Sequence, residues 1–371
     1  MTVIIFIIVL AVLIFVHELG HFLAAKLFGI RVDAFKLGFG PKVFAWRSKK
    51  KDPATGELKA GETEYGVNWL PFGGYVKIFG ENPDEQSLDV AGPEASRSFV
   101  LKARWKQAIV LAAGVLFNFI FAWFLYVGVF TAGVTASTDG FEQYASHFSN
   151  PRIMITYVEP GSPAEKAGLK EGDILLSRST VSSIQDEINA SAGKPVTIGY
   201  SREGNAFAAT VEATTSIIHG KYAIGISMDN VVDMRLPFTT SVWEGLRYTG
   251  VLIKETVVGL YTFIANIFVG HPDFSQVAGP VGIAGIVGNA AHMGMKYLIM
   301  VMAIISINLG VVNLIPFPAL DGGRILFVAI EGVIRRRISP RFTNAVNLIG
   351  FALLMILMVA VTWKDIVKLI N

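Results

Sequence analysis

Residues 1–27 read MTVIIFIIVLAVLIFVHELGHFLAAKL, an apolar run that carries two histidines and a glutamate near its end. Fifteen of the sixteen residues before His17 are apolar, Thr2 being the exception. A secretory signal peptide begins with a basic region and ends in a small-residue cleavage site. Here no Lys or Arg precedes Lys26, and the run ends in HELGH. We therefore expect a retained membrane helix that holds ionisable groups.

The composition is that of a membrane protein. Of 371 residues, 52% are apolar and 16% are charged, whereas soluble domains carry about 25% charged residues. The formal net charge of +3 is too small to indicate nucleic acid as a partner. The chain has no cysteine, which excludes disulfides, thiolate metal ligands and a cysteine nucleophile.

Three further segments are long and apolar enough to cross a bilayer, which takes about 20 residues. They are Ala108–Ala132, Tyr297–Pro316 and Ala345–Trp363. A fifth candidate, Thr256–Val269, has only 14 residues and follows a charged pair. That length favours a helix lying in the membrane interface. We therefore expect a multi-pass α-helical membrane protein with four transmembrane helices.

The Lys and Arg residues near the expected helices indicate their orientation. They follow the first helix, precede the second and lie between the third and fourth, at Lys26, Arg31, Lys36, Lys102, Arg104, Lys106, Arg324, Arg335, Arg336, Arg337 and Arg341. Residues 133–151, after the second helix, contain none. Because cytoplasmic loops are enriched in Lys and Arg, we expect both termini outside and the ends of the first and third helices at the cytoplasm.

Residues 150–232 have the composition of a soluble domain inserted between the second and third helices. Their pattern predicts a strand, a turn, a short helix, a Gly-Asp turn, a strand, a helix and two strands, the last pair joined at residues 202–205. We therefore expect an extracytoplasmic α+β domain at 150–232 and an interfacial segment at 233–296. Membrane helices then occupy 1–132 and 297–371.

A second non-helical segment, ETEYGVNWLPFGGYVKIFGE at residues 62–81, alternates apolar and polar residues on both sides of residues 71–74. The pattern predicts a cytoplasmic β-hairpin that turns at those four residues. The segment is too apolar for a solvated loop. We expect it to associate with the membrane, where protein or water satisfies its backbone.

HELGH fits the pattern H-E-x-x-H. On a helix, His17 and His21 lie one turn apart on the same face, so both can bind one Zn²⁺, while Glu18 beside them handles a proton. The alternative is two histidines satisfied within a helix bundle and a paired glutamate. His17 lies ~24 Å along the helix, near the inner edge of a ~30 Å hydrocarbon core. Ionisable groups in a membrane are functional by default, which favours the zinc site.

A catalytic zinc usually takes three protein ligands and one water. The remaining histidines lie in segments expected on the outer side, at His147, His219, His271 and His292. Asp321, in NLIPFPALDGG, follows the third helix and should lie at the same level as HELGH. Alone it would be read as a turn aspartate before two glycines. Because HELGH is present at the same level, we expect Asp321 to be the third ligand.

Four polar or small residues near the expected site have two possible roles. Asn308 and Asn313 offer amide groups close to Asp321, and their alternative role is interhelical hydrogen bonding. Gly114 and Asn118 share a face of the second helix, where close helix packing is the favoured role. The prolines at 316 and 318 should break the third helix and leave irregular backbone beside a water-containing cavity.

HELGH, GVLFN (114–118) and NLIPFPALDGG (313–323) together resemble the site-2 protease family, of the bacterial regulator of sigma-E protease type. The resemblance covers nearly the whole chain, including GFGP (38–41), PFGGYVKI (71–78) and FSQVAGPVGIAGI (274–286). VEPGSPAEKAGLKEGD, at 158–173, resembles a bacterial PDZ domain. The chain carries one such domain rather than two, and its segment SRSTV at 177–181 departs from the usual PDZ turn.

The resemblance implies one zinc ion per chain, held by His17, His21 and Asp321, with Glu18 as the catalytic residue. It also implies a set of substrate-binding residues in the third helix and the hairpin: Asn308, Asn313, Phe72, Gly73, Gly74, Tyr75 and Val76. The implied location is the bacterial inner membrane, with the active site near the cytoplasmic side.

We therefore expect an intramembrane zinc metalloprotease whose partners are the lipid bilayer and single-pass transmembrane substrates, such as anti-sigma factors or signal-peptide remnants. The PDZ domain would filter substrates by ectodomain size or bind a peptide carboxyl terminus. One alternative is a non-enzymatic PDZ membrane adaptor with a structural metal site. Another is a metal transporter, since intramembrane His and Asp also mark ion paths.

Overall fold

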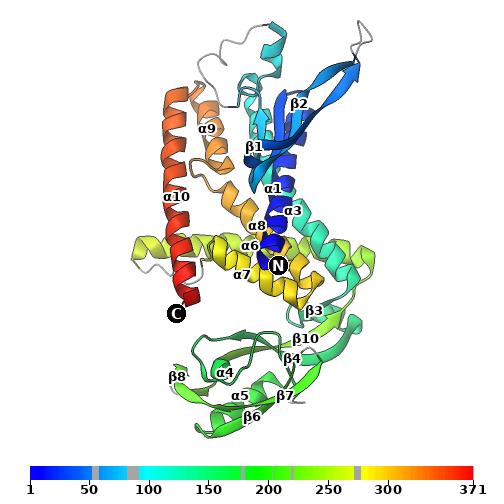
Figure 1. Ribbon diagram of the computed structural model, residues 1–371, viewed down its shortest axis with the longest axis vertical. Helices are drawn as coiled ribbons and strands as arrows, with labels where there is room; N and C mark the ends of the chain where they lie inside the picture. The colour runs from blue at the N-terminus through cyan, green and yellow to red at the C-terminus, as the bar shows by residue number, and fades with distance from the viewer. Residues whose placement is uncertain are drawn as a thin grey trace. The chain divides into compact units, whose positions relative to one another are not determined.

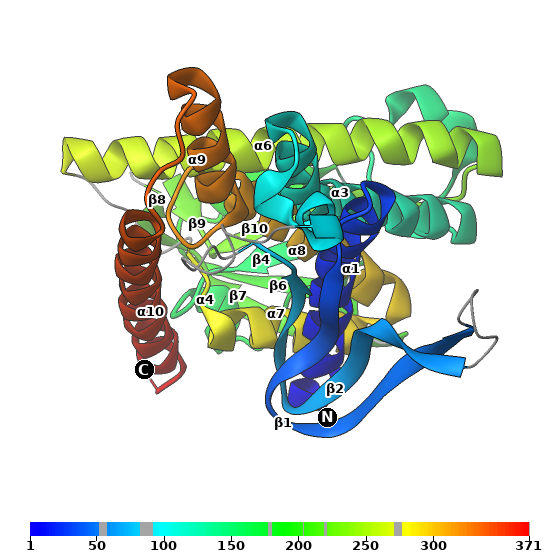
Figure 2. The same ribbon diagram turned by 90° about the horizontal axis from the view of Figure 1, so that it is seen from above.

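The computed structural model describes residues 1–51, 58–81, 92–176, 180–202, 204–218, 221–270 and 277–370. The chain divides into two compact units. One consists of Met1–Val127 together with Val242–Asn371, and the other of Gly128–Ser241. Figure 1 and Figure 2 show the elements of both units in two views.

The first unit is mainly helical. Among the described residues, five helices are long and apolar enough to cross a membrane: α1 (Thr2–Leu27), α3 (Arg104–Ala132), α6 (Phe238–Val269), α8 (Met295–Leu314) and α10 (Pro340–Ile370). Shorter helices complete the unit: η1 (Gly92–Arg97), η2 (Phe99–Leu101), α7 (Pro280–Met293) and α9 (Asp321–Ile334). α6 begins well before the predicted Thr256, and in Figure 1 it runs across the direction of α1 and α10.

The chain turns sharply between α8 and α9, where two prolines prevent the helix from continuing. The turn brings the start of α9 against the end of α8. A Cβ atom on Gly322 would lie 2.3 Å from the backbone oxygen of Leu314, and one on Gly323 would lie 2.2 Å from that of Phe317. The two glycines of LDGG are therefore required by close backbone packing, and they place Asp321 at the first position of α9.

α7 begins without a capping side chain of its own. The cap comes from α10 instead, because the buried carboxylate of Asp365 accepts a hydrogen bond from the backbone N–H of Gly282 at 2.7 Å. A Cβ atom on Gly279, the residue before α7, would lie 2.7 Å from the same carboxylate oxygen. The acidic cap suits the positive end of the helix dipole.

β1 (Val32–Lys51) and β2 (Leu58–Ile78) form a sheet beside α1. Both strands bend, so that residues 34–37 of β1 pair with two stretches of β2, 64–67 and 74–77. Residues 34–37 therefore lie between those stretches. In the part of the chain that the structure describes, the stretch 74–77 has no strand on its other side, so it forms an open edge.

The predicted hairpin turning at residues 71–74 is wrong in its strand partners. No pair joins the two halves of residues 62–81, since both halves pair with β1. β1 was not predicted, because its basic sequence contains glycines and a proline and does not alternate regularly between apolar and polar residues. Gly73 still marks a bend, with φ of 93°, and a Cβ atom there would lie 2.2 Å from the ring of Phe39.

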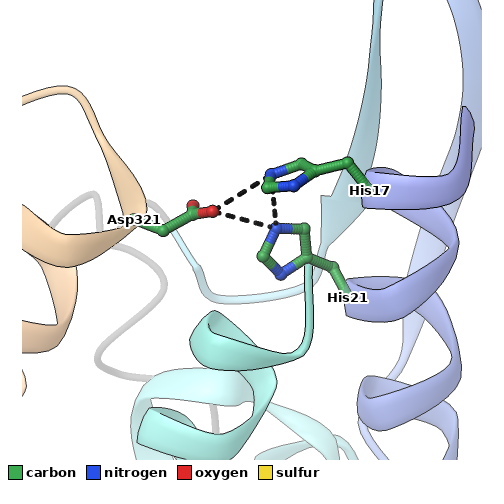
Figure 3. Close-up of side chains that lie close together, drawn as sticks. All are labelled: His17, His21 and Asp321. Atoms are coloured by element: carbon green, nitrogen blue, oxygen red, sulfur yellow. Dashed lines mark hydrogen bonds and ion pairs between the residues drawn. The ribbon is translucent and has the colours of Figure 1, made fainter. Parts of the chain in front are cut away.

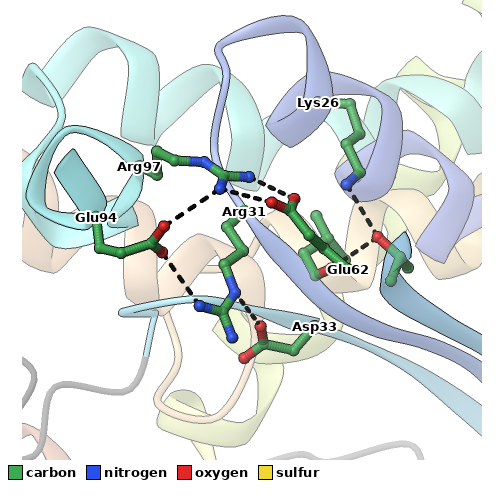
Figure 4. Close-up of polar contacts among 8 residues, drawn as sticks. Lys26, Arg31, Asp33, Glu62, Glu94 and Arg97 are labelled. Atoms are coloured by element: carbon green, nitrogen blue, oxygen red, sulfur yellow. Dashed lines mark hydrogen bonds and ion pairs between the residues drawn. The ribbon is translucent and has the colours of Figure 1, made fainter. Parts of the chain in front are cut away.

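A network of ion pairs fixes the end of α1 to the sheet and to η1 (Figure 4). Arg31 donates to Asp33 at 2.7 Å and to Glu94 at 3.1 Å. Arg97 donates to Glu62 at 2.7 Å and 2.5 Å, and to Glu94 at 3.4 Å. The Arg97 guanidinium lowers the pKa of Glu62. Such partly exposed pairs contribute ~0–1 kcal/mol each to the free energy of unfolding. Their main effect here is to connect three segments that are distant in the sequence.

The second unit contains a six-stranded sheet in the order β3-β10-β4-β5-β6-β7 and a two-stranded sheet of β8 and β9. Its elements are β3 (Val134–Ser137), η3 (Glu142–His147), β4 (Phe148–Val158), α4 (Pro163–Lys166), β5 (Ile174–Leu175), α5 (Val181–Ala190), β6 (Pro195–Arg202), β7 (Asn205–Glu212), β8 (Thr214–Ile218), β9 (Lys221–Ala223) and β10 (Ile226–Met234). From β4 to β7 they follow the predicted order, whereas β3, β8, β9 and β10 were not predicted.

Capping and a buried ion pair explain the local structure of this unit. Ser162 and Thr180 accept hydrogen bonds from backbone N–H groups in the first turns of α4 and α5. Asp173, from the predicted Gly-Asp turn, is buried and pairs with Arg202 at 2.7 Å. Residues 177–179 of the SRSTV segment and residue 203 of the predicted turn lie outside the described residues.

Candidate metal centre

Helix α1 presents His17 and His21 on one face, and the start of α9 presents Asp321 to them (Figure 3). The two Nε2 atoms lie 3.3 Å apart. Asp321 Oδ2 lies 3.1 Å from His17 Nε2 and 3.3 Å from His21 Nε2. Both histidines are buried, with 8% of their surface exposed. Three residues separated by about 300 positions in the sequence thus direct one ligand atom each to a common point.

This group fits a zinc ion. Two imidazole nitrogens and one carboxylate oxygen are a donor set that catalytic zinc uses, with a position left for water. Asp321 Oδ2 is buried, and in the described structure its polar neighbours are the two imidazole Nε2 atoms, with no hydrogen-bond donor aligned on it, although a buried carboxylate normally requires a partner. A cation between the three atoms would satisfy it. Among the described residues, no fourth His, Asp or Glu joins the group.

Helix α3 supports both histidines. His21 Nδ1 lies 2.8 Å from the backbone oxygen of Val110, and His17 Nδ1 lies 3.1 Å from Asn118 Nδ2. A Cβ atom on Gly114 would lie 2.3 Å from His21 Nε2, so only glycine leaves room for the imidazoles. From the sequence, helix packing is the favoured role of Gly114 and Asn118, and Val110 has no expected role. The four-residue spacing of these positions, which places them on one helix face, was the available signal.

Glu18 lies beside the histidines and faces the sheet. Its Oε2 accepts a hydrogen bond from the backbone N–H of Val76 at 2.9 Å. A cavity of about 600 Å³ opens here, lined by His17, Glu18, His21, Asp33, residues 75–81, Asp321 and Arg324. The carboxylate therefore borders a space large enough for a peptide segment, next to the three convergent ligand atoms.

The structure separates the expected substrate-binding residues into two groups. Tyr75 and Val76 line the cavity, and Gly73 and Gly74 precede them on the same strand. The side chain of Phe72 lies outside the described residues. Asn308 and Asn313, both on α8, do not line the cavity. The side chain of Asn308 accepts a hydrogen bond from Thr256 of α6 at 3.1 Å, which is the interhelical role named as its alternative.

Asn313 lies one and a half turns further along α8 and is half-buried. Among the described residues no hydrogen bond or ion pair of Asn313 assigns it a function, and its place in substrate binding stays a prediction.

Comparison with known proteins is consistent with this architecture. The model of peptidase family M50 matches residues 5–357. The chain is similar to zinc metalloprotease RasP of Shouchella clausii, 29% identical over 100% of both chains. It is also similar to RasP of Geobacillus kaustophilus, 30% identical over 98% of this chain and 97% of the relative. A Clostridium perfringens protein, named as a candidate zinc metalloprotease, is 35% identical over 96% and 95% of the two chains. The chain therefore belongs to peptidase family M50.

Proposed function

We propose that this protein hydrolyses peptide bonds within the transmembrane segments of other membrane proteins, at a zinc ion held by His17, His21 and Asp321. Its family and the names of its relatives indicate a zinc metalloprotease. The observation that carries the proposal is the convergence of three buried ligand atoms from α1 and α9 within the helical unit.

Glu18 is the proposed general base and acid. When bound, zinc supplies Lewis-acid polarisation of the scissile carbonyl and lowers the pKa of a coordinated water. Glu18 removes the proton of the attacking water and later donates it to the leaving amine. His17, His21 and Asp321 are held by packing against α3 and by the turn before α9. Water attacks directly, so no covalent acyl-enzyme forms.

The open edge of the sheet is the proposed site of substrate capture. A transmembrane helix hides its carbonyl groups in its own hydrogen bonds, so it must unwind before hydrolysis. An extended segment can then pair with residues 74–77 by β-augmentation and regain backbone hydrogen bonds. The cavity that these residues border contains Glu18 and the three ligand atoms, which supports this placement. Helix-destabilising residues in a substrate should therefore favour cleavage.

For the membrane topology, we propose four crossing helices, α1, α3, α8 and α10, with α6 along the interface. Two observations support this: the Lys and Arg distribution, and the direction of α6, which runs across that of α1 and α10 (Figure 1). Both termini and the second unit would then be extracytoplasmic and the zinc site near the cytoplasm. The named relatives are bacterial, which supports an inner-membrane location.

The second unit is proposed to be a PDZ domain. It carries a groove of about 370 Å³ between α5 and the β9–β10 region, with Asn189, Tyr222 and Gly225 among its lining residues. A groove between a helix and a strand suits an extended peptide. The proposed roles are to filter substrates by ectodomain size or to bind a peptide carboxyl terminus.

A cleavage assay tests the proposed function. The full chain, purified in detergent, is mixed with a model substrate that has one transmembrane helix. We expect cleavage within that helix, its loss on adding a zinc chelator, and its return with added zinc. A chain that binds zinc yet leaves every such substrate intact would instead be a membrane adaptor with a structural metal.

A further inference from the structure

The two histidines are supported in different ways at their Nδ1 atoms. The partner of His21 is the backbone oxygen of Val110, which can only accept a hydrogen bond. The proton of His21 therefore sits on Nδ1, and its Nε2 lone pair is available for a ligand. The partner of His17 is the side-chain amide of Asn118, which can donate or accept depending on which end faces the ring.

Whether the amide of Asn118 donates to His17 or accepts from it decides which nitrogen of His17 carries the proton. Asn118 is fully buried, and its Oδ1 makes no hydrogen bond in the described structure, while Nδ2 faces His17 Nδ1. With Nδ2 as the donor, the neutral imidazole must carry its proton on Nε2, the atom that faces Asp321. Such a tautomer has no Nε2 lone pair for a metal. A half-turn of the amide exchanges Oδ1 and Nδ2 with little change in shape.

We propose that Asn118 is a positioning residue of the zinc site: its side-chain oxygen accepts the Nδ1 proton of His17 and so directs the Nε2 lone pair to the ion. This rests on the proposed role of His17 as a ligand. Metal-bound histidines generally donate their second N–H to an acceptor that fixes the ring, and among the described contacts of His17 Nδ1 the amide of Asn118 is that group.

A second contact holds the backbone of Asn118. Ser306 of α8 is buried, and its hydroxyl donates to the backbone oxygen of Asn118 at 2.8 Å. Replacing Ser306 disturbs the packing of α3 against α8 at the same level but leaves the side-chain amide in place. Ser306→Ala is therefore the matched control for a purely structural role.

The test is zinc affinity of the full chain in detergent, measured by competition with a chromophoric chelator. Asn118→Leu keeps the side-chain size but removes the acceptor, and we expect a 10–100-fold loss of affinity, the usual effect of losing such a partner. Asn118→Asp keeps an acceptor and should rescue affinity to within about threefold. Ser306→Ala should bind zinc as the wild type does. Asn118→Leu binding zinc as tightly as the wild type, or Ser306→Ala weakening it equally, would overturn the proposal.

A spectroscopic measurement needs no variant that could misfold. In ¹⁵N-histidine-labelled wild type, adding zinc should give His17 the resonances of an Nδ1-protonated, Nε2-bound ring. An Nε2-protonated His17 in the zinc-loaded protein would overturn the role of Asn118. His17→Ala separates the two proposals: if it leaves zinc affinity unchanged, the ligand assignment fails, whereas if it abolishes binding and Asn118→Leu does not weaken it, only the role of Asn118 fails.

Discussion

The carboxylate of Glu18 accepts a hydrogen bond from the backbone N–H of Val76, with 2.9 Å between Oε2 and the amide nitrogen. Val76 belongs to the open edge of the sheet, and an unpaired edge is where an added strand forms its hydrogen bonds. The proposed general base is therefore hydrogen-bonded to the proposed substrate-binding edge. In the proposed substrate complex, a substrate carbonyl pairing with Val76 would take this N–H from Glu18 and leave the carboxylate free to face the scissile bond.

Hydrogen exchange should detect this contact directly. We expect Glu18→Ala to accelerate exchange of the Val76 amide, because the variant removes its acceptor, and Glu18→Gln to retain most of the protection. The amide of Phe79, which donates to the backbone oxygen of Arg31 at 2.9 Å, serves as the internal control. Unchanged exchange at Val76 in Glu18→Ala would show that the bond does not persist in solution.

Glu18→Gln should also separate catalysis from folding. The amide cannot take a proton from water, so we expect cleavage of a transmembrane substrate to fall by at least ~10²-fold. Zinc content and thermal stability should stay close to those of the wild type. Full cleavage activity in this variant would exclude Glu18 as the general base.

Asp321→Asn should lower the zinc content of the purified protein, because the variant replaces a charged oxygen ligand with a weaker neutral one. Elemental analysis after dialysis measures the stoichiometry. Asp33→Asn is the matched control, since Asp33 lines the same cavity but pairs with Arg31. One zinc per chain in Asp321→Asn, with affinity unchanged, would mean that another residue is the third ligand.

The close contact of α3 with the histidines predicts the effect of a single methyl group. Gly114→Ala places a Cβ atom 2.3 Å from His21 Nε2, so the ring must move, and zinc affinity should fall by about tenfold or more. Gly128→Ala, on the same helix, meets no atom within 4 Å and should change stability by no more than ~1 kcal/mol. Equal zinc affinity in the two variants would show that the site tolerates the shift.

Glu64 gives the sheet a predicted dependence on pH. Lys36, at 2.5 Å, and Lys42, at 3.0 Å, lower the pKa of Glu64 to about 2. Because the folded-state pKa lies below the ordinary value near 4.5, the stabilisation is complete above about pH 4.5 and is lost as the pH falls toward 2. Thermal unfolding followed from pH 6 to pH 2 should show a steeper loss for the wild type than for Glu64→Gln. Parallel curves would rule out this contribution.

The sequence predicts most of the elements that carry the site, for identifiable physical reasons. An unbroken apolar run identifies α1, and the spacing of His17 and His21 places both on one face of it. The two prolines and LDGG mark the break that brings Asp321 to the same level. These signals are local. Because successive membrane helices run in alternating directions, the ends of the first and third helices lie at the same level, and this alone predicts that the three residues meet.

What the sequence did not reveal depends on contacts between distant segments. The strand partner of residues 74–77 is β1, and nothing in the basic sequence of β1 indicates that pairing. The contacts of Val110 and Asn118 with the imidazoles depend on the rotation of α3 about its axis, which the apolar composition of that helix leaves unspecified. α6 was predicted too short because the charged pair Lys254 and Glu255 interrupts its apolar sequence.

The cap that Asp365 provides for α7 also sets an order of assembly. The capping carboxylate follows Gly282 by 83 residues, so during synthesis the start of α7 emerges long before its partner exists. The backbone N–H of Gly282, in the first turn of α7, therefore gains this acceptor only once Asp365 of α10 has been made. This cap therefore cannot form while α1, α3 and α7 are being synthesised, so it is made late in the assembly of the first unit.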